Sequence, residues 1–186
     1  MSLDILKSKL KENNISGVFL FCGAEEYTKD YYAAQIRNKV DSSPLPEFNH
    51  IYFNAAEGAI SDLEDAIYSL PYMWDIKLIE ITNIESAKLT EGDINEYSRV
   101  FSDIPDYLTI LTVLRHDDDD DKEKASKKAL NSFIKAVREN GVVVAIGSSE
   151  LQIYDEQLRD VFARADHMMY ERKRELKLMG VKTREM

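Results

Sequence analysis

Short apolar runs of strand length alternate with longer amphipathic segments along the chain, and this alternation constrains the fold more than any other feature. The apolar runs are residues 17–23, 50–54, 77–82, 107–114 and 141–147. Segments with helical spacing lie between and after them, at residues 25–40, 61–70, 90–101, 122–139 and 155–179. Strands joined through helices form crossover units, which build parallel sheets. The pattern therefore predicts an α/β fold, with a mostly parallel five-stranded sheet and helices on both faces.

Helix start signals mark two of the amphipathic segments. Ser61 is followed three residues later by Glu64, which predicts an N-cap at Ser61. Thr90 precedes Asp93 by the same spacing and is expected to cap the next helix. These signals place a helix between each pair of strands in the middle of the chain.

Composition and charge exclude several classes of protein. The net charge of −10 argues against broad binding to DNA or to anionic membranes, which requires clustered basic residues. Cys22 is the only cysteine among the 186 residues, so neither an intrachain disulfide nor a cysteine-based zinc cluster can form. The N-terminus lacks the apolar segment of a signal peptide, and no apolar run approaches the ~18 residues of a membrane span. We expect a soluble cytoplasmic protein with no membrane partner.

The loop after the first strand is where a nucleotide would bind, because open parallel sheets bind ligands at the carboxyl ends of their strands. A phosphate-binding loop needs several glycines followed by Lys-Ser or Lys-Thr, whereas this loop has only Gly23. Glu25 and Glu26 stand at the helix N-terminus, where they would repel phosphate. We therefore expect no nucleotide and no other cofactor.

The sequence gives equally little support for a metal site, a reactive cysteine or an acid-base pair. The acidic run at residues 117–121 is expected to be a solvated loop, since adjacent carboxylates rarely converge on one metal ion. Cys22 ends a buried strand and is expected to be a small core residue. His116 lies beside Asp117, but no motif supplies a nucleophile for this pair. The sequence predicts no catalytic residue and no bound metal.

An apolar segment between a helix and a strand points instead to binding. It comprises Leu70, Pro71, Tyr72, Met73 and Trp74. Connecting loops are usually polar, and Tyr, Trp and Met are enriched at protein interfaces. Either this segment packs into the core or it presents an apolar wedge to a partner, and composition alone does not decide between the two.

Three stretches in this order resemble a known family. Residues 18–27 combine an apolar strand, a glycine, two acidic residues and an aromatic; residues 70–79 combine a proline-aromatic stretch, a basic residue and an aliphatic strand. Residues 105–114 form the strongest strand, with a Lys-Lys pair and a Gly-Val-Val-Val run downstream. Together they resemble the N-terminal domain of the delta subunit of bacterial DNA polymerase III, part of the sliding-clamp loader.

The resemblance implies an AAA+-type, RecA-like domain without a P-loop over residues 1–146. It implies a replication module that contacts the sliding clamp (the beta subunit) and opens one interface of the ring. The inserted wedge would correspond to residues 70–74, with Tyr72 and Met73 as the best match to the inserted pair. Nucleotidyl transfer would belong to the DNA polymerase III holoenzyme, and this chain would have no activity of its own.

The resemblance also implies partners. The family carries further helical domains for loader assembly, so we expect this chain to contact the clamp without building the loader. Contacts with other clamp-loader subunits would belong to a full-length protein, and DNA would be met only indirectly.

The C-terminal segment, residues 147–186, resembles a different family. Ala165, Asp166, Met169, Tyr170 and Lys173 follow the pattern of the closing helix of a GGDEF (diguanylate cyclase) domain. No Gly-Gly-(Asp/Glu)-Glu-Phe motif occurs in the chain, so catalysis is not expected. We expect a helical segment that packs on the same sheet. The alternatives to a clamp-loader module are a fragment or remnant of a GGDEF-type cyclase signalling domain and an α/β interaction domain without an identified partner.

Overall fold

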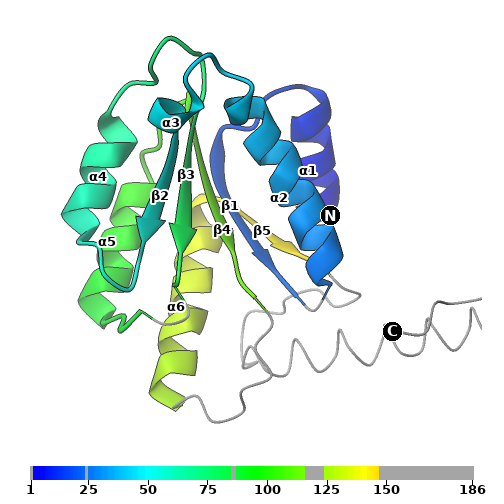
Figure 1. Cartoon of the computed structure of the whole chain (residues 1–186). Helices are drawn as coiled ribbons and strands as arrows, with labels where there is room; N and C mark the ends of the chain where they lie inside the picture. Colours follow the sequence, from blue (N-terminus) through cyan, green and yellow to red (C-terminus); the bar gives the residue numbers. More distant parts are fainter. Residues whose placement is uncertain (1, 24, 85–86, 116–123, 147–186) are drawn as a thin grey trace, which may run out of the picture.

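Five parallel strands form one sheet in the order β2-β3-β4-β1-β5 in the computed structural model (Figure 1), which describes residues 2–23, 25–84, 87–115 and 124–146. The strands are β1 (Gly17–Cys22), β2 (His50–Asn54), β3 (Lys77–Thr82), β4 (Leu108–Val113) and β5 (Val142–Ala145). Every neighbouring pair is parallel. The predicted parallel five-stranded sheet is therefore confirmed.

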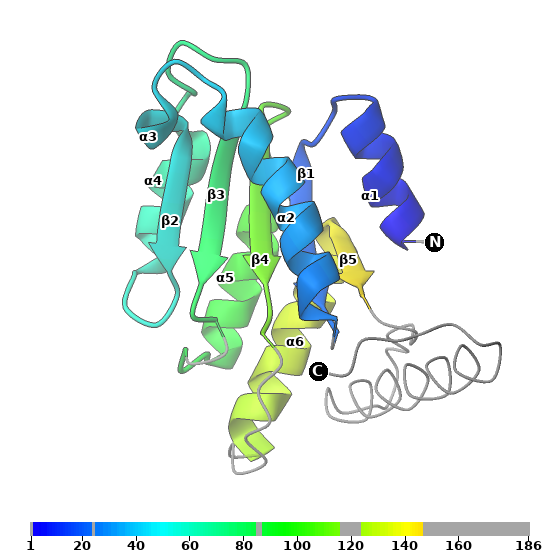
Figure 2. The same cartoon turned by 45° about the vertical axis from the view of Figure 1, so that its right-hand side comes forward.

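Helices cover both faces of the sheet, as predicted (Figures 1 and 2). One face carries α1 (Ser2–Lys11) and α2 (Glu26–Asp41); the other carries α4 (Ile60–Tyr68), α5 (Glu91–Phe101) and α6 (Lys124–Asn140). A short helix, α3 (Pro46–Asn49), leads directly into β2. Neither α1 nor α3 was predicted from the sequence.

The interior strand β1 contributes side chains to two separate cores, one on each face of the sheet. Val18, Leu20 and Cys22 join the core under α4, α5 and α6. Phe19 and Phe21 join the core under α1 and α2. Because successive side chains point to opposite faces, a strand buried on both faces must be apolar at every position.

Helix starts agree with one prediction and correct another. Thr90 caps α5: the Asp93 N–H donates to Thr90 Oγ1 at 3.2 Å, and the Thr90 N–H donates to Asp93 Oδ2 at 2.7 Å. The predicted N-cap at Ser61 is wrong, because α4 begins at Ile60 and its capping position is Ala59, two residues before Ser61. Ile60 packs against the core one turn before buried Leu63, and this apolar contact draws it into the helix.

Cys22 is a fully buried free thiol. Burial raises its pKa to about 12, so the thiol stays protonated at neutral pH. The prediction that Cys22 is a core residue is confirmed.

Several predicted features lie outside the described residues. They are His116, the acidic run at 117–121, the helix at 155–179 and the GGDEF-like pattern from Ala165 to Lys173. Among the residues that are described, no helix is long and apolar enough to cross a membrane.

Candidate functional site

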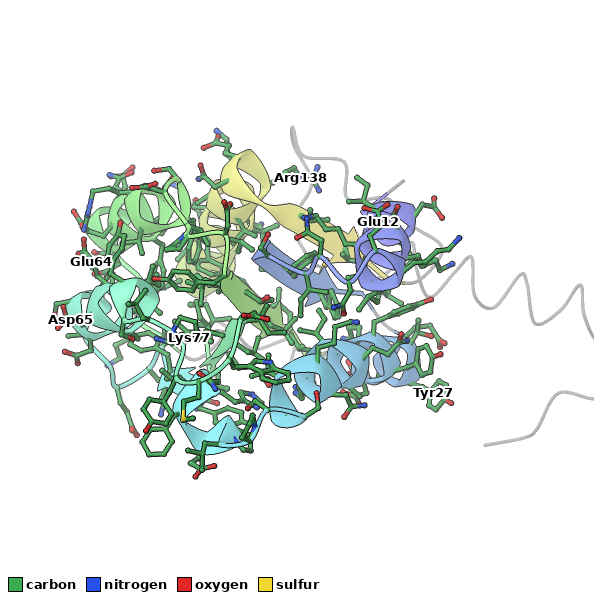
Figure 3. All side chains as sticks on the ribbon, turned by 90° about the horizontal axis from the view of Figure 1, so that it is seen from above. Glu12, Tyr27, Glu64, Asp65, Lys77 and Arg138 are labelled. Carbon is green, nitrogen blue, oxygen red and sulfur yellow. The ribbon has the colours of Figure 1, made fainter. Side chains whose placement is uncertain are left out.

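The loop between α4 and β3 exposes most of its apolar side chains. The exposed fractions are 77% for Leu70, 50% for Tyr72, 72% for Met73 and 37% for Trp74, while Pro71 is half-buried. We call residues 70–74 the apolar loop. It precedes β3, so it lies at the amino ends of the strands, the end that faces the viewer in Figure 3. The loop is thus a surface feature rather than part of the core.

Lys77 secures the end of α4, which leads into the apolar loop. Its buried ammonium group donates to the Ser69 carbonyl at 3.0 Å, and it also bonds the Ala66 carbonyl and Ser69 Oγ. The last carbonyls of a helix lack partners within the helix, and a cation there also complements the helix dipole. Burial lowers the pKa of Lys77. The basic residue seen in the sequence between the aromatic stretch and the strand is therefore a C-terminal cap for α4.

Asn49 secures the middle of the apolar loop. The Tyr72 N–H donates to Asn49 Oδ1 at 2.7 Å, and Asn49 Nδ2 donates to the Tyr72 carbonyl at 2.9 Å. Asn49 is the last residue of α3 and is fully buried. Met73 follows with a φ of 50°, a left-handed conformation that turns the chain after the bonded residue. The backbone is thus fixed while the side chains of Tyr72 and Met73 remain exposed.

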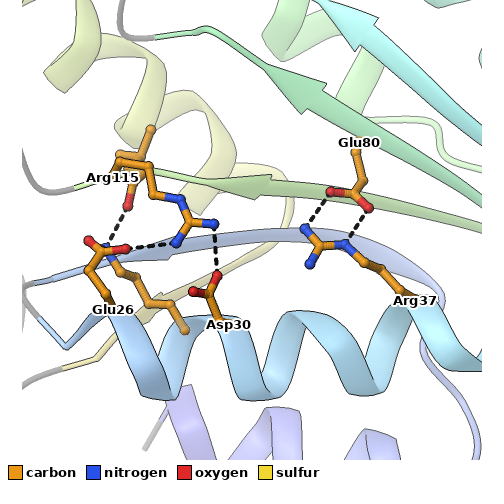
Figure 4. Close-up of polar contacts among 7 residues, drawn as sticks. Glu26, Asp30, Arg37, Glu80 and Arg115 are labelled. Atoms are coloured by element: carbon orange, nitrogen blue, oxygen red, sulfur yellow. Dashed lines mark hydrogen bonds and ion pairs between the residues drawn. The ribbon is translucent and has the colours of Figure 1, made fainter.

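An ion-pair network anchors the region next to α3. Arg37 of α2 donates twice to Glu80 of β3, at 2.6 and 2.7 Å (Figure 4). His50, which follows Asn49, places Nε2 at 2.7 Å from Glu80 Oε1 and Nδ1 at 2.8 Å from Asp41 Oδ1. Burial raises the pKa of Glu80, but hydrogen bonds from Arg37 and His50 outweigh it and hold the pKa at about 2. This network links α2, β2 and β3 next to Asn49, the residue that holds the backbone of the apolar loop.

At the carboxyl ends of the strands, where a nucleotide would bind, the start of α2 forms ion pairs with cations of the protein itself (Figure 4). The ammonium group of buried Lys29 lies 2.5 Å from Glu26 Oε1 and 2.6 Å from the carbonyl of Leu114, the residue after β4. Arg115 lies 2.7 Å from Asp30 and 2.8 Å from Glu26, and the hydrogen bonds to these two carboxylates raise its pKa. Glu26, at the predicted acidic helix start, therefore pairs with basic side chains of the protein itself.

Gly23, directly after β1, is needed for close packing of the backbone at the carboxyl ends of the strands. Its φ is +111°, and a Cβ there would lie 2.0 Å from the Ile146 carbonyl oxygen. The Ile146 N–H in turn donates to the Cys22 carbonyl at 2.7 Å. Glycine here allows the chain after β5 to pass close to the end of β1. No group of three or more potential metal ligands occurs within residues 2–23, 25–84, 87–115 and 124–146.

Sequence reasoning found the apolar loop but missed its supports. Asn49 gave no signal, because a single asparagine after an unpredicted one-turn helix looks like any polar loop residue. Phe48 was also missed: its ring centroid lies 5.3 Å from that of Tyr72, and 56% of the residue is exposed. Both residues belong to α3, which brings them to the loop only in the folded chain.

A family model described as DNA polymerase III, delta subunit, matches residues 19–140. No curated protein matches the chain. One similar structure is the DNA clamp loader delta protein of Bacillus subtilis, with 15% identity and a TM-score of 0.57, over 78% of this chain and 42% of that one. Another is a DNA polymerase III gamma subunit-related protein of Thermotoga maritima, with 13% identity and a TM-score of 0.53, over 81% of this chain and 47% of that one.

The chain spans less than half the length of each of these two structures. At these identities the likeness concerns the fold. It confirms the expected AAA+-like α/β architecture.

Proposed function

The chain belongs to the DNA polymerase III delta subunit family, and on that premise we propose that it is a non-catalytic clamp-loader module that binds the DNA sliding clamp and opens it during replication. Residues 70–74 form the clamp-binding element in this proposal. The observation that carries it is an exposed apolar loop whose backbone is held at Tyr72 by Asn49 and that follows a helix end held by Lys77.

Exposed apolar side chains can supply the binding energy. Burying a side chain such as Tyr72 or Met73 in a partner's pocket contributes about 1.5–3 kcal/mol. Binding also costs less conformational entropy when the binding segment is already ordered. The two hydrogen bonds between Asn49 and Tyr72 provide this order before the partner arrives.

Opening follows from unequal affinity for two states of the ring. A protein that binds the open ring more tightly than the closed ring shifts the equilibrium toward opening by that difference. Side chains inserted next to a ring interface would fit the open state better. The module needs no nucleotide for this step, and loading would be driven by other subunits of the complex.

The division of the chain belongs to the same proposal. Residues 1–146 would be the delta-like unit, and residues 147–186 a helical segment that packs on the same sheet. We assign contacts with other clamp-loader subunits to the full-length protein in the cytoplasm, and contact with DNA to the clamp. The cyclase alternative rests on residues outside the described part of the chain and gains no support from the described residues.

Binding to a purified sliding clamp from the same organism tests the proposal. Surface plasmon resonance would compare the full 186-residue chain with a Tyr72→Ala/Met73→Ala variant. We expect the double variant to bind about 100-fold more weakly or worse, since two buried apolar side chains are lost. Tyr27→Ala is the matched control, because Tyr27 is an 82% exposed aromatic on α2, well away from Lys77 in Figure 3.

Three outcomes are decisive. The proposal is supported if the double variant binds the clamp weakly while the wild-type chain and Tyr27→Ala bind it normally. Equal binding by a folded double variant, checked by circular dichroism, contradicts the role of the apolar loop. A folded wild-type chain that does not bind the clamp contradicts clamp binding itself.

A further inference from the structure

The exposed apolar surface does not end with the apolar loop. Phe48 of α3 is 56% exposed, and its ring is tilted by 40° against the ring of Tyr72, with the centroids 5.3 Å apart. The two rings come from segments far apart in sequence. Scattered exposed apolar residues are ordinary, but a contiguous group of them marks an interaction site.

Phe48 is fixed in the same way as the loop. It precedes Asn49, whose side chain is buried and closes both hydrogen bonds on the Tyr72 backbone. Movement of α3 would therefore disturb Phe48 and Tyr72 together. The two rings behave as one preformed unit, which is the arrangement expected for an anchor that fills a pocket.

Acidic residues border this unit. Glu47 precedes Phe48, Asp75 follows Trp74, and both acidic residues are exposed. Lys39 lines a hollow of about 490 Å³ together with Trp74 and Asp75, and its ammonium group donates to Asn13. Lys77 is buried against the end of α4. The charged residues next to Phe48 and to Trp74 in the sequence are thus both acidic, in a protein of net charge −10, and Lys39 is the cation that shares the hollow with Trp74.

We propose that Phe48 and the apolar loop form one docking surface with an acidic rim, and that it fits an apolar pocket bordered by basic residues on the sliding clamp. This inference rests on the proposed function and adds a contact residue and the charge of the partner's rim. Complementary charge around an apolar contact mainly increases the association rate and fixes the orientation of docking.

The contribution of Phe48 is tested in the clamp-binding assay described above. We expect Phe48→Ala to raise the dissociation constant about tenfold, the loss typical of a truncated interface aromatic. Tyr27→Ala should leave it unchanged. If Phe48→Ala binds like the wild-type chain while Tyr72→Ala/Met73→Ala does not, the extension to Phe48 is wrong and the proposed function stands. If the wild-type chain does not bind, both fail.

The acidic rim is tested by charge reversal and salt. Glu47→Lys should lower the association rate about threefold at low salt and weaken its dependence on ionic strength. The matched control is Glu57→Lys, because Glu57 is exposed and lies between β2 and α4, at the opposite end of the strands. Equal association rates for Glu47→Lys and Glu57→Lys would contradict the proposal that basic residues border the pocket on the clamp.

The alternative to the clamp as the partner of this surface is a second copy of this chain. Sedimentation of the wild-type chain and of Phe48→Ala distinguishes it. We expect both to be monomers. A wild-type dimer that Phe48→Ala dissociates would assign the surface to self-association and overturn the proposal.

Discussion

Asn49 and Tyr72 are joined by a reciprocal pair of hydrogen bonds, in which the Asn49 side chain accepts from the Tyr72 N–H at 2.7 Å and donates to the Tyr72 carbonyl at 2.9 Å. The pair satisfies both backbone groups of a residue in a loop that has no sheet partner. It leaves the Tyr72 side chain out of the bonding. Asn49 therefore fixes the backbone of the apolar loop at Tyr72.

Replacing Asn49 should loosen the loop. Asn49→Ala removes two hydrogen bonds from a buried site and leaves two backbone groups without partners, at a cost of about 1–3 kcal/mol in the free energy of unfolding. Clamp binding should weaken as well, because the loop is no longer ordered in advance. Urea unfolding measures the first effect. Asn38→Ala, at an exposed asparagine of α2, is the control, and equal stability of the two variants would contradict the anchoring role.

His50 should make stability depend on pH. Both ring nitrogens face carboxylates, at 2.8 Å from Asp41 and 2.7 Å from Glu80, and only the protonated ring can donate to both. Burial lowers the pKa of His50, but the hydrogen bonds to Glu80 and Asp41 outweigh it and raise the pKa above its ordinary value of 6.5. The native state therefore keeps a proton that the unfolded chain releases.

The sign of the effect follows from this raised pKa. The stabilisation is fully present below pH 6.5 and is lost as the pH rises through the pKa of the native state. Urea unfolding from roughly pH 5.5, about one unit below the ordinary histidine pKa, up to roughly pH 9 should show a wild-type advantage over His50→Gln that shrinks as the pH increases. An advantage that is constant or grows would contradict the bridged arrangement of His50.

The sheet was predictable because its evidence is local. Each strand is an apolar run that needs no knowledge of its neighbours, and Thr90 caps α5 with a residue three positions away. The supports of the apolar loop were not predictable, because Asn49 reaches Tyr72 across 23 positions through a tertiary contact. Composition also left open whether residues 70–74 are buried.

Gly23 illustrates a residue whose structural role the sequence did not reveal. The sequence showed only that a single glycine is too few for a phosphate-binding loop, whereas the structure shows that its missing Cβ makes room for the Ile146 carbonyl. The sequence separation of these two residues again hides the contact. A glycine next to a strand signals a backbone requirement, but it does not say whether a ligand or another part of the chain comes close.

Substitution of Gly23 should accordingly be costly. Gly23→Ala places a Cβ 2.0 Å from a backbone oxygen at a φ of +111°, so β1 and the chain after β5 must separate. We expect a loss of about 3 kcal/mol or more in the free energy of unfolding. Gly92→Ala is the control, since Gly92 lies in α5 and a Cβ there would meet only the Thr90 hydroxyl, at an ordinary contact distance of 3.5 Å. Thermal or urea unfolding of both variants gives the comparison, and equal midpoints would show that the close approach to Ile146 does not exist.

The central claim is that the chain binds a sliding clamp and favours its open state. One titration tests both parts: the affinity of the wild-type chain for the closed clamp ring and for a clamp variant whose subunit interface is broken by mutation. We predict binding to both forms, with the interface-broken clamp bound about tenfold more tightly or better, because about 1.4 kcal/mol of differential affinity is needed for each tenfold shift toward opening. Equal affinity for the two forms, or no binding to either, would contradict the account.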